Sequence, residues 1–252
     1  MIDGAGCEKT AKPNLSVRGY DLIAAIKTEL EKRCPGVVSC SDIEILATRD
    51  AYALAGGRRY PVRTGRRDRR RSSAADVVLP GEGDTATQAT AYFGRLGFSQ
   101  LETVVLLGAH TVGITHCSKI KARLYSYGGK AGATDPSLHP EDAAVYKKYV
   151  CPNTASADNN VVYLDLQSSV SRLDNSYYKR LQGGRGVLSV DQNLYANGTS
   201  ALKILTYRLY ARSTNHLLGE YTMHTWFEFG QRYLGNIGPV DQPDFVPKCT
   251  EK

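Results

Sequence analysis

The stretch from residue 101 to residue 117, LETVVLLGAHTVGITHC, constrains the fold more than any other part of the chain. Ser99 precedes it, and Glu102 follows Ser99 by three residues, a spacing that predicts a capping box at the start of a helix. The run VVLL that comes next is apolar on every side, so the helix is expected to be buried. The helix leads to His110, between Gly108 and Gly113, and glycine lets the backbone approach a flat ligand closely. His110 is therefore either a core histidine with a hydrogen-bonded ring or an axial metal ligand.

Hydrophobic periodicity predicts a fold that is mostly α. An apolar face indicates an amphipathic helix over residues 17–33, which Pro35-Gly36 ends. Ser41 and Glu44 predict a second capping box that opens a helix over residues 41–53. The best candidate strand is short, over residues 161–164, and residues 58–84 read as a long loop without a period. Further helices are expected over residues 85–95, 140–149, 174–181, 200–212 and 217–234.

Composition indicates an ordinary globular protein with a basic surface. Hydrophobic residues make up 42% and charged residues 23% of the chain, and no apolar run approaches the ~20 residues of a membrane span. The formal net charge of +7 favours acidic partners such as pectin-like polymers, anionic lipid or nucleic acid, without choosing among them. Six cysteines without a C-x-x-C pair, together with sequons at Asn14 and Asn197, suit a secreted protein.

Family resemblance decides between the two interpretations of His110. The segment GAHTVGITHCSKIKARLY resembles the proximal-histidine segment of the plant secretory (class III) haem peroxidases. The resemblance continues, in the family's order, through PNLSVRGYDLIAAIK, CPGVVSCSDIEILATRD, TGRRD, LDNSYYKRL and GVLSVDQNL, and weakens after about Asn215. It implies one peroxidase domain over residues 1–252, folded as two helical lobes of about 1–100 (distal) and 101–252 (proximal) with haem b between them. His110 would be the axial iron ligand.

The resemblance also implies a carboxylate that supports the axial histidine. Peroxidase iron needs an electron-rich imidazole, which a carboxylate hydrogen-bonded to the far ring nitrogen provides. The family places this carboxylate in a VDQ or SDQ segment, which here makes it Asp191. The alternative for Asp191 is an aspartate in a turn.

A calcium site on the proximal side is a further implication of the resemblance. Calcium prefers oxygen ligands, and Thr111 beside the axial histidine would supply two. The other ligands come from a D-x-x-S/T-x-x-x-x-D segment, which places Ser169 at the hydroxyl position and Asp174 at the last carboxylate. The first carboxylate position falls on Leu166, with Asp165 beside it. Either a one-residue adjustment lets Asp165 bind, or the site has lost a carboxylate.

The distal side of the haem site departs from the family. The family's distal arginine and histidine lie upstream of a GCDAS motif, and this sequence starts after that motif, so no distal catalytic residue is expected in it. Residues 1–15 show no signal-peptide pattern, and we interpret Met1 as an internal start or a truncated gene model. Glu8 and Asn14 match residues that support the family's distal side. Pro80 matches the substrate-access segment.

The resemblance implies two disulfides, Cys117–Cys151 and Cys40–Cys249. The family partner of Cys34 would lie upstream of this sequence, and Cys7 is not a family position. A Cys7–Cys34 bridge and two free thiols stay open as alternatives.

Three functional hypotheses follow. The first is a monomeric peroxidase, secreted or vacuolar, that oxidises phenolic donors with hydrogen peroxide. The second is a haem-binding pseudo-peroxidase without distal catalysis. The third is a polyanion-binding surface protein that acts through the eight arginines of residues 58–71, with acidic cell-wall polymers rather than a specific nucleic acid as partner. The family's use of the GRRD core, residues 65–68, as a structural ion-pair knot argues against the third hypothesis for at least part of this stretch.

Overall fold

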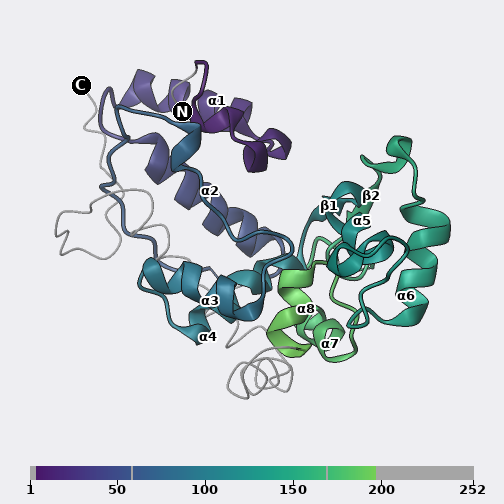
Figure 1. Ribbon diagram of the computed structural model, residues 1–252. Coiled ribbons are helices and arrows are strands. Elements are labelled where there is room, and N and C mark those ends of the chain that lie inside the picture. Colours follow the sequence, from purple (N-terminus) through teal and green to yellow (C-terminus); the bar gives the residue numbers. More distant parts are fainter. Residues whose placement is uncertain (1–3, 58, 169, 197–252) are drawn as a thin grey trace. The chain divides into compact units, whose positions relative to one another are not determined.

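The computed structural model describes residues 4–57, 59–168 and 170–196, and these are mostly helical, as predicted (Figure 1). They fall into two compact units, residues 4–79 and residues 80–196, with the division between Leu79 and Pro80. This division lies earlier in the chain than the expected lobe boundary near residue 100. The reason is that helix α3 (Ala86–Arg95) contacts α4 (Gln100–Leu107) and α8 (Ser189–Ala196), and therefore belongs with the residues that follow it.

The first unit contains two long helices that pack against each other. Helix α1 spans Tyr20–Arg33 and α2 spans Cys40–Leu54. Three short 3₁₀-helices accompany them, at Glu8–Thr10, Lys12–Ser16 and Ala74–Asp76. The helix predicted over residues 17–33 begins three residues late because Gly19, with a φ of +92°, turns the chain immediately before Tyr20. The last of the three 3₁₀-helices is the one helical turn in the described part of the long loop predicted over residues 58–84.

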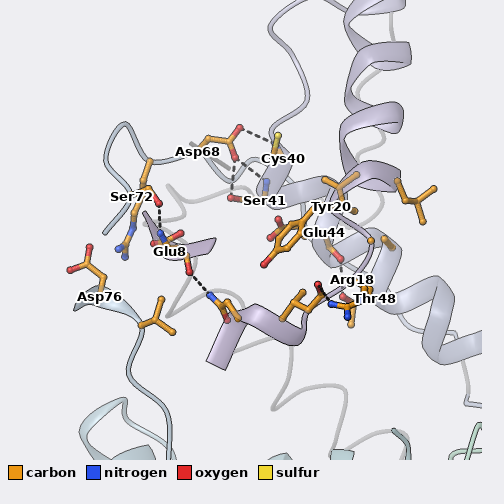
Figure 2. Close-up of a pocket in the computed structure, with 18 of the residues that line it drawn as sticks. Glu8, Arg18, Tyr20, Cys40, Ser41, Glu44, Thr48, Asp68, Ser72 and Asp76 are labelled. Carbon is orange, nitrogen blue, oxygen red and sulfur yellow. Dashed lines mark hydrogen bonds between the residues drawn. The ribbon is translucent and has the colours of Figure 1, made fainter. Parts of the chain in front are cut away.

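The start of α2 differs from the predicted capping box. Ser39, rather than Ser41, is the N-cap residue, and its side-chain oxygen accepts a hydrogen bond from the Asp42 backbone nitrogen at 3.1 Å. The Cys40 and Ser41 backbone nitrogens, which would otherwise lack partners at the helix start, both donate at 2.9 Å to the carboxylate of Asp68 (Figure 2). The prediction based on Ser41 and Glu44 was wrong because a residue far along the chain completes this cap.

Asp42 also anchors the arginine-rich loop. Its carboxylate accepts hydrogen bonds from the Gly65 backbone nitrogen at 2.7 Å and from the Arg66 guanidinium at 3.1 Å. Asp42 and Arg66 are 4% and 3% exposed, so the ion pair is buried. Gly65 has a φ of +108°, a conformation that few residues other than glycine adopt. The GRRD core is therefore structural, as the resemblance implies.

The second unit begins with α3 and α4 and carries the histidine segment. Helix α4 opens with the predicted capping box of Ser99 and Glu102, and Val104 and Val105 inside it are completely buried. A 3₁₀-helix, Gly108–Thr111, follows directly. The remaining elements are β1 (Ile114–His116), α5 (Cys117–Tyr125), α6 (Pro140–Val145), a π-helical turn (Tyr146–Val150), β2 (Val161–Tyr163), α7 (Ser176–Gln182) and α8, with 3₁₀ turns at Tyr127–Gly129 and Ala155–Ala157.

The core of this unit lies around α7 and α8, which contact each other (Figure 1, light green). Tyr178, Leu181 and Leu194 are completely buried there. The two strands pair antiparallel, with Thr115 opposite Val162. The strand near residue 161 was predicted; its partner β1 and helix α8 were not. The helices predicted over residues 200–212 and 217–234 lie outside the described residues. No helix in the described part of the chain has the length and apolar character to cross a membrane.

Candidate functional site

Gly108 places the 3₁₀-helix that carries His110. A Cβ atom at residue 108 would lie 2.1 Å from the hydroxyl oxygen of Tyr178 in α7, so only glycine fits against this buried tyrosine. The end of α4 therefore lies directly on α7. Gly113, which has a φ of +98°, turns the chain from the 3₁₀-helix into β1. Local structure therefore explains why glycine stands at both positions that flank His110, in addition to the close approach of a ligand expected from the sequence.

His110 forms a close pair with Asp191 of α8. Its Nδ1 lies 2.9 Å from Oδ1 and 3.1 Å from Oδ2 of the aspartate. The Asp191 side chain is 1% exposed, whereas that of His110 is 29% exposed. Burial by itself lowers the pKa of the imidazole, but the charge and hydrogen bond of Asp191 outweigh burial and raise this pKa above its usual value. Asp191 is an aspartate buried in a helix rather than in a turn.

Tyr177 of α7 is a third member of the cluster, and sequence reasoning did not single it out. Its hydroxyl donates to Asp191 Oδ1 at 2.9 Å, and the residue is 2% exposed. Burial, followed by the nearby Asp191 charge, raises the pKa of Tyr177 well above its usual value, so the phenol stays protonated and acts as a donor. The motif LDNSYYKRL contains this tyrosine, but no spacing in the sequence shows which of its two tyrosines faces Asp191.

The chemistry of the cluster fits a metal-bound imidazole. A histidine that binds a metal through one nitrogen usually donates its other ring N–H to a carboxylate or carbonyl. The Asp191 carboxylate is hydrogen-bonded to Nδ1 of His110, and within the described residues no group forms a hydrogen bond with Nε2. The partly exposed ring and the buried carboxylate behind it are the arrangement that an axial haem ligand requires.

The residues expected at the calcium site also meet in the second unit. The Thr111 hydroxyl donates to Asp165 Oδ2 at 3.0 Å and lies 3.1 Å from the carbonyl oxygen of Asp174. The hydroxyl of Ser176, which the sequence reasoning missed, lies 2.6 Å from Asp165 Oδ2 and also contacts the carboxylate of Asp174, so its single proton is shared between the two carboxylates. Burial raises the pKa of Asp165, although several hydrogen bonds oppose this effect. Among the described residues there is no group of three or more histidine, cysteine, aspartate or glutamate side chains that could hold a metal.

Asp165 and Leu166, the two residues at the first carboxylate position, point in different directions. Asp165 is 3% exposed and faces Thr111, whereas Leu166 is 42% exposed. The chain therefore turns the aspartate inward and the leucine outward. Ser169 lies outside the described residues. Pro80 is the first residue of the second unit and is half-buried, and its assignment to substrate access stays a prediction.

Glu8 and Asn14 line a cavity of about 920 Å³ in the first unit (Figure 2). The Asn14 side-chain amide donates to the Glu8 carbonyl at 2.8 Å, and the Glu8 backbone nitrogen donates to the Ser72 hydroxyl at 2.9 Å. Glu44 and Tyr20 also line the cavity. Burial has the largest effect on the pKa of the Glu44 carboxyl and raises it above its usual value. The described contacts of Glu8 and Asn14 hold the 3₁₀-helices of the first unit together.

The cysteines follow the expected pattern only in part. Cys117 and Cys151 form a disulfide, with their Cα atoms 5.3 Å apart. Cys40 carries a free thiol, so the structure contradicts the expected Cys40–Cys249 bond at this cysteine, and Cys249 lies outside the described residues. Cys34 is disulfide-bonded, whereas Cys7 is free, so no Cys7–Cys34 bridge forms. Disulfide connectivity depends on which side chains meet, and the six-residue spacing of Cys34 and Cys40 does not determine it.

Comparison with known proteins agrees with this geometry. The family model described as Peroxidase matches residues 1–208. Peroxidase 57 of Arabidopsis thaliana is 46% identical over 194 residues, which cover 77% of this chain and 59% of that protein. Peroxidase 10 of the same plant is 40% identical over 243 residues, 95% of this chain and 66% of that protein. Peroxidase N1 of Nicotiana tabacum is 39% identical over 203 residues, 79% of this chain and 60% of that protein.

The chain therefore spans about 59–66% of the length of these relatives. The family match covers most of the chain and includes the His110–Asp191 pair, which joins two motifs that the family keeps in the same order. This chain belongs to the peroxidase family and, within it, to the plant class III haem peroxidases.

Proposed function

We propose that this chain binds haem b through His110 and contributes the proximal site of a peroxidase that oxidises phenolic donors with hydrogen peroxide. The observation that carries the proposal is the His110–Asp191 hydrogen bond of 2.9 Å, made by a partly exposed imidazole and a buried carboxylate. Secretion or a vacuolar location is proposed from the family, and the Cys117–Cys151 disulfide suits an oxidising compartment.

Each residue of the cluster has a defined part in this proposal. His110 would hold the iron through Nε2. When bound, haem supplies the redox chemistry that reduces peroxide and oxidises the donor. Asp191 holds the Nδ1 proton in a water-excluded site and gives the imidazole partial imidazolate character, which favours oxidised iron.

Calcium is proposed as a second cofactor, bound by oxygen atoms of Thr111, Asp165 and Asp174, with Ser169 added from the resemblance. Support comes from the convergence of the first three residues beside His110. The calcium ion would brace the 3₁₀-helix that carries the axial histidine, since calcium takes 6–8 oxygen ligands and joins the segments that supply them.

A second candidate function is haem binding without efficient turnover. Peroxide cleavage needs a general base opposite the axial ligand, and a site that binds haem through His110 without such a base would react slowly with peroxide. The two candidates share the axial site and differ in the rate of the reaction with peroxide.

A binding function toward acidic cell-wall polymers is favoured by three arginines. Arg63, Arg67 and Arg70 are exposed, and within the described residues none of their side chains has a carboxylate partner. By contrast, Arg66 is buried against Asp42, and Arg71 is paired with Asp76. The free positive charge of the loop is therefore smaller than the sequence suggests, but it lies on the surface, where it attracts polyanions.

The decisive experiment reconstitutes the chain with haem and compares the Soret spectrum of the wild type with that of His110→Ala. His116→Ala is the matched control, because it removes another histidine of the second unit that has no contact with Asp191. We expect His110→Ala alone to change the spectrum; identical spectra for all three proteins would refute the axial assignment. Rapid mixing with hydrogen peroxide then separates the candidates, because a peroxidase reacts many orders of magnitude faster than free haem.

A further inference from the structure

The hydrogen bond of Tyr177 to Asp191 carries an inference beyond haem binding. Asp191 Oδ1 accepts two hydrogen bonds, one from His110 Nδ1 and one from the Tyr177 hydroxyl, both at 2.9 Å. The other carboxylate oxygen of Asp191, Oδ2, lies farther from the same histidine nitrogen, at 3.1 Å. The imidazole and the phenol therefore compete for one carboxylate oxygen.

Burial makes this competition strong. Asp191 is 1% and Tyr177 2% exposed, so water does not screen either hydrogen bond. A phenol that donates to a carboxylate withdraws negative charge from the shared oxygen and makes it a weaker acceptor for a second hydrogen bond. The pull of Asp191 on the Nδ1 proton of His110 is therefore weaker with Tyr177 present than without it.

We propose that Tyr177 is a positioning residue that limits the imidazolate character of His110 by sharing Oδ1 of Asp191. The phenol sets how electron-rich the axial imidazole is, and it fixes the orientation of the carboxylate. The inference rests on the proposed haem site, because the electron density of the imidazole matters to the reaction only when His110 binds iron.

The chain supplies a matched control in the next residue. Tyr178 is also completely buried in α7, and its ring centroid lies 5.0 Å from that of Tyr177. Its hydroxyl donates to the Val104 backbone carbonyl at 3.3 Å and not to Asp191. Tyr178→Phe thus removes the same atom from the same helix without changing the carboxylate, and a merely structural role of Tyr177 would give both variants the same phenotype.

The test measures the iron–histidine bond in the haem-reconstituted chain. We expect Tyr177→Phe to raise the ferrous iron–histidine stretching frequency in resonance Raman spectra and to move the Fe(III)/Fe(II) midpoint potential to a more negative value. Asp191→Asn should shift both quantities in the opposite direction, and Tyr178→Phe should leave both unchanged. If Tyr177→Phe behaves like the wild type while Asp191→Asn shifts, the inference is wrong and the proposed haem site stands.

A second measurement does not depend on haem. In the haem-free chain, the His110 Nδ1 proton is observed by NMR, and its resonance moves downfield as its hydrogen bond to Asp191 strengthens. Tyr177→Phe should move this resonance downfield, and Tyr178→Phe should not. An unchanged resonance in Tyr177→Phe overturns the inference. A downfield shift in a chain that fails to bind haem through His110 would support the competition for Oδ1 while refuting the proposed function.

Discussion

His110 Nδ1 lies 2.9 Å from Asp191 Oδ1 although 81 residues separate the two in the chain. The pair depends on α7, because the 3₁₀-helix that carries His110 and the helix α8 that carries Asp191 both contact it. Changes that displace α7 should therefore affect the pair even where they touch neither residue, whereas changes that leave the helix in place should not.

Replacement of Gly108 by alanine should destabilise the protein. The new Cβ would lie 2.1 Å from the Tyr178 hydroxyl oxygen, and overpacking of this kind costs about 1–3 kcal/mol of unfolding free energy. Gly94→Ala is the control, because Gly94 lies in α3 with no atom within 4 Å of the added Cβ, and it should stabilise by about 0.5–1 kcal/mol. Urea unfolding measures both. Adding Tyr178→Phe should recover part of the Gly108→Ala loss, and equal losses with and without it would contradict the proposed steric cause.

Asp42→Asn should be among the most destabilising single changes in the first unit. It leaves the buried Arg66 guanidinium without its carboxylate, and breaking a buried ion pair from one side costs about 3–5 kcal/mol. The exposed pair of Arg71 and Asp76 provides the comparison, since the Arg71 side chain is 77% exposed and Asp76→Asn should cost less than about 1 kcal/mol. Chemical denaturation measures the unfolding free energy of both variants. Similar losses of unfolding free energy would show that the Asp42–Arg66 pair does not anchor the loop.

The stabilisation that Asp68 provides should depend on pH. Burial alone would raise the pKa of Asp68, but hydrogen bonds from the Cys40 and Ser41 backbone nitrogens outweigh burial and lower this pKa below its usual value. A carboxyl whose pKa is lower in the folded state contributes its full stabilisation above the unfolded-state pKa, and loses it as pH falls through the folded-state pKa. Asp68→Asn should therefore cost about 1 kcal/mol at neutral pH, and progressively less below about pH 4.

Ser39→Ala is the control for this pH dependence. Ser39 caps the same helix with a neutral hydroxyl, so its loss should cost a similar amount, about 1 kcal/mol, at every pH in this range. Unfolding free energies measured between pH 3 and pH 7 test both variants. Parallel pH profiles for Asp68→Asn and the wild type would show that the carboxylate charge does not contribute.

Alkylation should distinguish the cysteines. Under native, non-reducing conditions, Cys40 should react with iodoacetamide, and Cys7, which is buried, should react only after unfolding. Peptide mapping should recover Cys117 linked to Cys151, a bond whose sequence separation of 34 corresponds to a stabilisation of about 3.8 kcal/mol in the chain-entropy description. Recovery of Cys40 in a peptide linked to Cys249 would restore the pairing expected from the resemblance.

The surface arginines should give salt-sensitive binding to polygalacturonate. Replacing Arg63, Arg67 and Arg70 together by glutamine should weaken binding at low salt on the order of tenfold and reduce its salt dependence. A variant with Lys130, Lys148 and Lys179 replaced by glutamine removes the same charge from exposed positions of the second unit, and should bind nearly as the wild type does. Equal weakening in both variants would indicate a net-charge effect, and sequence-selective, salt-resistant binding to DNA would overturn the preference for acidic polymers.

Local patterns in the sequence were sufficient for several features of the fold. The Ser99–Glu102 box, the buried run of α4 and the position of His110 at its end were predicted correctly, because each depends on contacts within one or two helical turns. The resemblance pointed to Asp191 as the partner of His110, and the geometry agrees with that expectation.

Contacts between segments far apart in the chain could be identified only in the folded protein. Ser39 rather than Ser41 caps α2, where Asp68 accepts a hydrogen bond from the Ser41 backbone nitrogen, and Asp165 rather than Leu166 faces Thr111 just after the end of β2. Cys34 rather than Cys40 is disulfide-bonded for the same kind of reason. Spacing along a chain determines which residues share a helical turn. Which side chains meet across the core depends on the direction that each one takes after packing. The hydrogen bond from the Tyr177 hydroxyl to Asp191 could therefore be identified only in the tertiary structure.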